Sequence, residues 1–101
     1  MQKIPKHVEI IGHKYSVVIS TEMSEDELGR CDYNNQKILI SKHQASDTMR
    51  DTLLHEIIHA FHWLMGLGDN STEEEFTART TTGLRSVMLQ NPEVVNYLLG
   101  R

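Results

Sequence analysis

Two histidines and a glutamate near the middle of the chain form the segment with the clearest chemical potential. His55 and His59 are four residues apart, and Glu56 directly follows the first histidine. Residues four apart lie on one side of an α-helix, so both imidazoles can reach one metal ion. Glu56 is rotated by about 100° from His55, which places its carboxylate beside a water on the metal rather than on the metal itself. This HExxH spacing is typical of zinc-dependent hydrolysis.

The residues around this segment predict the helix that the motif requires. From about Gln44 the apolar residues recur at helical spacing. Ser46 or Asp47 is expected to cap the start of the helix, and Gly66 and Gly68 mark its end. A helical projection separates a core face from a histidine face that carries His55, His59 and His62. The alternative is that this second face is an ordinary solvent face with tolerated histidines.

A catalytic zinc usually has three protein ligands and one open position, so a third ligand is needed. Cys31 is the only cysteine and lies on a predicted strand, which makes it unsuitable. The next helix begins with Glu73, Glu74 and Glu75 after a short connection, so the two helices can pack antiparallel. Its projection slightly favours Glu73, and all three acids also suit a helix start. His62 is about 10 Å along the axis from His55, so we expect it at the surface or in a cleft.

Strands are predicted before this helix and helices after it. Residues 8–11 and 15–19 form a first hairpin around 12–14, and residues 30–33 and 37–41 form a second around 34–36. Helices follow over about 44–65, 72–90 and 92–99, the last one starting at Pro92. We therefore predict an α+β domain: antiparallel β-hairpins or a small sheet, the HExxH helix, a second antiparallel helix and a short C-terminal helix.

Length and composition restrict the remaining possibilities. The 101 residues fit a single domain, 1–101. A net charge of −4 and a pI near 5.8 argue against a broad surface for nucleic acid. A single cysteine suits a reducing compartment. Neither a secretory signal nor an apolar run of about 18 residues is visible, so we expect a cytoplasmic protein without a membrane span.

Residues 53–60, Leu-Leu-His-Glu-Ile-Ile-His-Ala, resemble the active-site helix of small phage-associated zinc metallopeptidase-like proteins. These are distant relatives of the ImmA/IrrE metallopeptidases, within the gluzincin group, whose third ligand is a glutamate. Segments 3–6 with 11–15, 29–33 with 37–40, 74–84 and 91–92 look like other parts of the same proteins. The resemblance implies a minimal zincin-like fold, Zn²⁺ held by His55, His59 and Glu74, and Glu56 as the catalytic residue. It also implies that strand 37–41 borders the cleft as an edge to which an extended peptide could add.

The sequence departs from this pattern in the second helix, where Ala78 follows Glu74 by one turn and cannot brace a zinc histidine. Tyr33, His62 and Tyr97 are possible partners for the oxyanion of a peptide-bond intermediate. The leading expectation is a zinc metallopeptidase acting on a protein or peptide. One alternative is a catalytically weak or inactive zinc-binding module for a partner protein. The other is a DNA-associated peptidase, which the acidic pI disfavours. The sequence does not indicate an oligomeric state.

Overall fold

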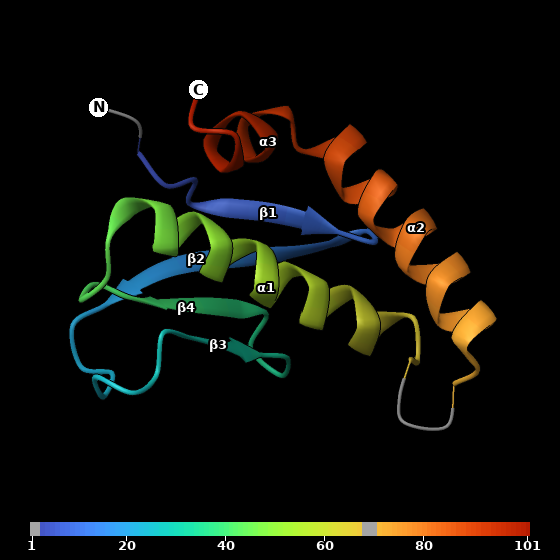
Figure 1. The fold of residues 1–101 in the computed structure, drawn as a ribbon, viewed down its shortest axis with the longest axis horizontal. Coiled ribbons are helices and arrows are strands. Elements are labelled where there is room, and N and C mark those ends of the chain that lie inside the picture. The colour runs from blue at the N-terminus through green and yellow to red at the C-terminus, as the bar shows by residue number, and fades with distance from the viewer. Residues whose placement is uncertain (1–2, 68–70) are drawn as a thin grey trace.

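The computed structural model describes residues 3–67 and 71–101, and in these residues four strands precede three helices (Figure 1). The predicted α+β class and element order are therefore confirmed. The elements are β1 (His7–Ile10), β2 (His13–Ser20), β3 (Gly29–Asp32), β4 (Lys37–Ser41), α1 (Ser46–Leu64), α2 (Glu73–Gln90) and α3 (Pro92–Leu98).

The four strands form one mixed sheet in the order β1-β2-β4-β3. Both predicted hairpins are present, because β1 pairs antiparallel with β2 and β3 pairs antiparallel with β4. The two hairpins join through a parallel pairing of β2 with β4. Strand 37–41 is therefore interior, and the prediction that it is an edge was wrong. Its Ile38, Leu39 and Ile40 suit a central strand, whereas β3 carries a glycine and an arginine and takes the edge.

The turn between β1 and β2 is shorter than predicted. It consists of Ile11 and Gly12, both with positive φ, of 47° and 78°. Two positive φ angles are the signature of a type I′ turn, whose twist matches that of a two-stranded ribbon. His13 and Lys14, which we expected near the turn, already belong to β2. Ile11 is an unusual choice there, since a β-branched residue is disfavoured at positive φ.

The core lies between one face of the sheet and α1, which crosses that face in Figure 1. Alternate residues of the strands point inward, as a half-buried sheet requires. α1 contributes the apolar side of its helix, confirming the core face of the projection. The buried residues of this layer are Val8, Ile10, Tyr15, Val17, Ile38, Ile40, Leu53, Ile57, Ala60 and Phe61.

Gly83 and Asn91 each help α2 and α3 pack on this core. A Cβ on Gly83 of α2 would lie 3.0 Å from ring atom Cδ1 of Phe61, so the glycine permits close packing of α2 on α1. Asn91, buried between α2 and α3, accepts a hydrogen bond from the backbone N–H of Glu9 at 2.8 Å. Its amide donates to the carbonyls of Glu9 and Val87. Asn91 thus satisfies backbone groups of β1, which lies at one edge of the sheet.

The helix ends agree in part with the sequence prediction. α1 has Ala45 at its N-cap without a side-chain cap, so neither Ser46 nor Asp47 caps it. Gly66, with φ of 68°, follows its end as predicted, and Gly68 lies outside the described residues. At the start of α2 the Thr72 hydroxyl accepts a hydrogen bond from the backbone N–H of Glu75. Thr72 therefore caps the start of α2.

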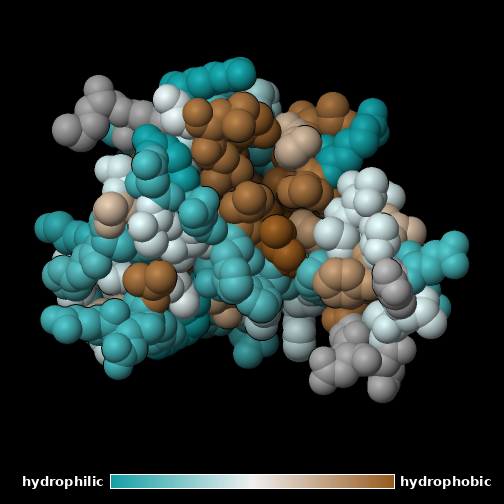
Figure 2. Space-filling view, viewed as in Figure 1, coloured by the Kyte–Doolittle hydropathy of each residue, from teal (hydrophilic) through white to brown (hydrophobic). Residues whose placement is uncertain are grey.

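Apolar side chains gather in the middle of the face shown in Figure 2, where the three helices meet. The groove there has a volume of about 210 Å³. It is lined by Leu54, Ile57, Leu84, Val87, Met88, Val94, Val95, Leu98 and Leu99. No helix in the described ranges is long and apolar enough to cross a membrane.

Candidate metal centre

His55 and His59 converge on the exposed side of α1. Their Nε2 atoms lie 3.0 Å apart, and their rings meet edge to face at a centroid distance of 4.6 Å. Two nitrogens bound to a tetrahedral zinc at about 2.0–2.1 Å would lie about 3.3 Å apart. The pair therefore fits a zinc ion after a shift of a few tenths of an ångström. Both side chains are exposed, so an ion and a substrate can reach them.

Glu56 lies on a different side of α1 and is buried, with 7% of its surface exposed. No hydrogen bond or ion pair joins its carboxylate to another described residue. A buried carboxylate without partners is costly unless a ligand or a proton compensates it. Burial raises the pKa of Glu56, while the His55 and His59 imidazoles lower it and Glu27 raises it further. The raised pKa suits a group that takes up and returns a proton.

The edge strand β3 packs directly against Glu56 through Gly29. A Cβ on Gly29 would lie 2.6 Å from Cγ2 of Thr52 and 3.0 Å from Oε2 of Glu56. Only a glycine allows the strand to approach α1 this closely. Thr52 is also buried, and its hydroxyl donates to Gln44 at 2.8 Å. We did not predict a role for Gly29 or Thr52, although a glycine within a β-prone segment often marks a close backbone approach.

A cleft of about 550 Å³ lies beside the histidines, between α1 and residues 26–29. His55 and Glu56 form part of its wall. The loop that makes the opposite wall is held in place, because the carbonyl of Leu28 accepts bonds from the N–H of Ser41 and from the Gln44 amide, both at 2.9 Å. The paired histidines thus lie beside a preformed hollow that contains the buried carboxylate.

The comparison with protein families identifies this arrangement. Residues 6–90, most of the chain, match the model of the SprT-like family, a metallopeptidase-like family with the HExxH motif. The chain belongs to the SprT-like family. Neither the curated proteins nor the solved structures gave a match. The family supports the coarser expectation of a zinc-binding, metallopeptidase-like chain; kinship with ImmA/IrrE and a phage association stay predictions.

In this SprT-like chain the predicted third ligand stands apart from the histidine pair. Glu74 lies in the first turn of α2 and is exposed. Among the side chains that the structure describes, no three of His, Cys, Asp or Glu form a group that could hold a metal ion. The side chain of Glu73, the alternative ligand, lies outside what the structure describes. The set of His55, His59 and Glu74 therefore stays a prediction.

His62 has a packing role that the sequence prediction missed. Its Nε2 lies 3.0 Å from the Thr80 hydroxyl, and its ring contacts those of Phe61 and Phe76. It is half-buried between α1 and α2, whereas we expected it at the surface or in a cleft. Burial, with a smaller effect from His59, lowers the pKa of His62. A neutral imidazole is therefore the form that joins the two helices.

Of the remaining candidate groups, Tyr33 and Cys31 interact electrostatically with Glu56, whereas Tyr97 lies in the core. Tyr33 stacks on Trp63, with ring centroids 4.7 Å apart, and burial with the charges of Cys31 and Glu56 raises its pKa. Burial, with smaller effects of Glu56 and Asp32, raises the pKa of Cys31 to about 12, so in the metal-free protein it is a thiol at neutral pH. Tyr97 is buried under the Arg50 guanidinium and belongs to the core. Tyr33 is thus the remaining tyrosine candidate for an oxyanion partner.

Proposed function

We propose that this SprT-like protein is a zinc-dependent peptidase that hydrolyses a peptide bond in a protein or peptide. The observation that carries the proposal is the convergence of His55 and His59 beside a buried, unpartnered Glu56. The family match agrees with a metallopeptidase-like module.

His55 and His59 would hold the zinc ion together with Glu74. Zinc, when bound, supplies a Lewis acid that polarises a carbonyl and lowers the pKa of water to about 7. Glu56 accepts a proton from the attacking water at a carboxylate oxygen and passes it to the nitrogen of the leaving amine. Its burial keeps bulk water away from that proton, and Gly29 holds the strand that shields it. Tyr33, protonated at neutral pH, is the candidate donor to the developing oxyanion.

An extended substrate would add to the edge of the sheet at β3. Among the described residues β3 has one strand partner, β4, and it packs against α1 beside Glu56. Main-chain groups on its free side are available for pairing with a peptide. This edge replaces strand 37–41 in the sequence-based expectation.

The deciding experiment measures zinc content and peptidase activity of the wild type and of Glu56→Gln. We expect near-stoichiometric zinc in both proteins, and loss of activity in the variant alone. A folded wild type that takes up no zinc would contradict the proposal. Zinc uptake without activity towards any peptide, with partner binding retained in Glu56→Gln, would favour the alternative, a non-catalytic zinc-binding module.

A further inference from the structure

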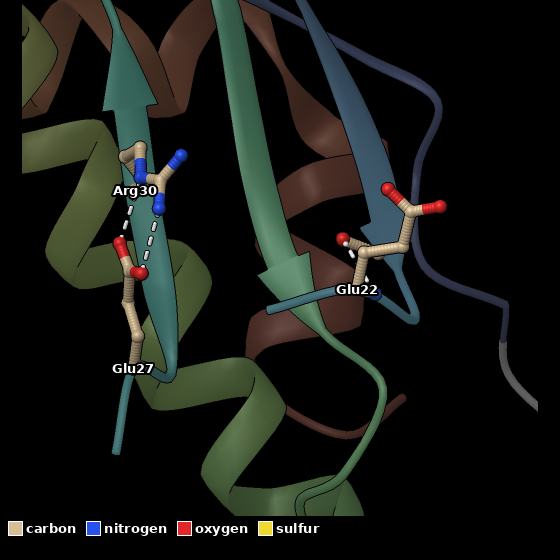
Figure 3. Close-up of polar contacts among 4 residues, drawn as sticks. Glu22, Glu27 and Arg30 are labelled. Atoms are coloured by element: carbon tan, nitrogen blue, oxygen red, sulfur yellow. Dashed lines mark hydrogen bonds and ion pairs between the residues drawn. The ribbon is translucent and has the colours of Figure 1, made fainter. Parts of the chain in front are cut away.

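The cleft beside the histidines is strongly acidic. Four carboxylates line it, those of Asp26, Glu27, Asp51 and Glu56, and no lysine or arginine does. The negative charge of Glu27 is compensated by Arg30, whose guanidinium donates a hydrogen bond to each carboxylate oxygen at 2.7 Å. Figure 3 shows this pair, with Glu22 apart from it beyond the end of β2. The described residues offer no hydrogen bond or ion pair to the side chains of Asp26 or Asp51. The cleft therefore holds uncompensated negative charge.

A second observation indicates that a ligand completes the cleft. Glu56 is more than nine-tenths buried, lines the cleft and has no partner among the described residues. A proton donor entering the cleft would satisfy it or the acids at its mouth. Asp51 lies four residues before His55, about 6 Å along the α1 axis. The distance from Asp51 to the predicted metal ligand His55 is thus about the length of two residues of extended peptide.

The walls of the cleft also have an apolar part. Leu28 is 44% exposed and lines the cleft, and Thr48 and Thr52 line it from α1. An apolar stem with a cationic head matches such a site, since lysine and arginine bury their methylenes while the charge reaches polar groups. A short cation or an uncharged apolar side chain would satisfy one of these two features alone.

We propose that this cleft is a specificity site for a lysine or arginine side chain of the substrate, whose stem packs on Leu28 and whose cationic head lies between Asp26 and Asp51. The inference rests on the proposed peptidase function, which it extends to polypeptides with a basic residue near the cleaved bond. The head donates hydrogen bonds to the two carboxylates, and the rigid loop around Leu28 provides the preformed wall.

The test compares fluorogenic peptides that differ at one position, with lysine, arginine, norleucine or glutamate. Norleucine keeps the stem of lysine and removes its charge. For the zinc-loaded wild type we expect kcat/KM for the basic peptides to exceed that for norleucine by about three- to tenfold, since a partly exposed ion pair contributes modestly. In Asp26→Asn/Asp51→Asn this ratio should fall towards one. The matched control is Glu22→Gln/Glu93→Gln, which removes the same charge from exposed sites outside the cleft.

Binding of the same peptides, labelled for fluorescence anisotropy, is measured with zinc-loaded Glu56→Gln. Cleavage without preference for a basic residue, or a preference that both double variants lose equally, overturns the inference and leaves the peptidase function intact. Preferential binding of basic peptides that depends on Asp26 and Asp51, without cleavage by the wild type, overturns the peptidase function and supports the cleft. Neither binding nor cleavage overturns both.

Discussion

The charge of a single buried carboxylate dominates the candidate centre. Glu56 has a pKa raised chiefly by burial, which disfavours its charged form in the folded state relative to the unfolded state. The stability that this neutral form contributes is fully present below the unfolded pKa and is lost as pH rises through the folded pKa. In the metal-free protein, Glu56→Gln should therefore raise the melting temperature at about pH 8, and the gain should vanish towards about pH 4.

Thermal unfolding of the two proteins across this pH range, in the presence of a chelator, tests that prediction. Glu22→Gln is the control, because Glu22 is exposed and should show no such pH-dependent gain. An equal effect of both substitutions, or a gain that grows as pH falls, would show that Glu56 is not destabilised by its burial.

Gly29 is the second residue whose identity the site requires. Gly29→Ala places a Cβ 2.6 Å from Cγ2 of Thr52 and close to Glu56. We expect a loss of about 1–3 kcal/mol of unfolding free energy, measured in urea, because the packed strand and helix must separate. Thr52→Ser removes that Cγ2 atom and keeps the hydroxyl. The double variant Gly29→Ala/Thr52→Ser should therefore recover part of the loss; additive effects would argue against a contact between the two positions.

At the scale of residues, the sequence predicts the chemical groups of the candidate site but not the residues that pack around them. The HExxH spacing predicts His55, His59 and Glu56 because a helix fixes their relative positions locally. Gly29 and Asp26 reach the same place only through the sheet, and nothing in their local sequence specifies that approach. The packing of His62 between two helices was not predicted for the same reason, since its partner Thr80 is on another helix.

At the scale of elements, local patterns predicted well and pairings between distant elements did not. β-Branched segments and turn residues were enough to locate both hairpins, and apolar residues at helical spacing with helix-start and helix-end residues located the three helices. The parallel pairing of β2 with β4 joins residues about twenty apart, and a sequence pattern contains no information on such a register. That pairing moves the edge of the sheet from residues 37–41 to β3, and with it the place where a peptide can add.

One side chain connects the helical layer to the edge of the sheet. Asn91 makes three hydrogen bonds with backbone groups of Glu9 and Val87. Asn91→Ala leaves these groups without that partner, so we expect a loss of about 2–4 kcal/mol in unfolding free energy. Urea denaturation measures the loss, and Asn96→Ala, an exposed asparagine on α3, is the matched control. Equal small losses in both variants would show that the three bonds add little to stability.

At the scale of the whole molecule, binding of zinc is expected to couple to folding. An ion that binds the folded state alone stabilises it by about 2.7 kcal/mol when present at a hundred times its dissociation constant. For a chain of this size that corresponds to a rise in melting temperature of about 10–20 °C. His59→Ala should lose this rise, whereas His43→Ala should keep it, because His43 is an exposed histidine outside α1.

The same melting experiment tests the predicted third ligand. Glu74→Ala should lose most of the zinc-induced rise, whereas Glu75→Ala, a change of the same size one residue along, should keep it. Glu74 would have to reach the histidine pair from the first turn of α2. The zinc-induced rise in melting temperature therefore tests whether this turn contributes a ligand. A full rise in Glu74→Ala would assign the third ligand to another residue. A folded wild type that shows no rise with zinc would mean that His55 and His59 do not form a zinc site.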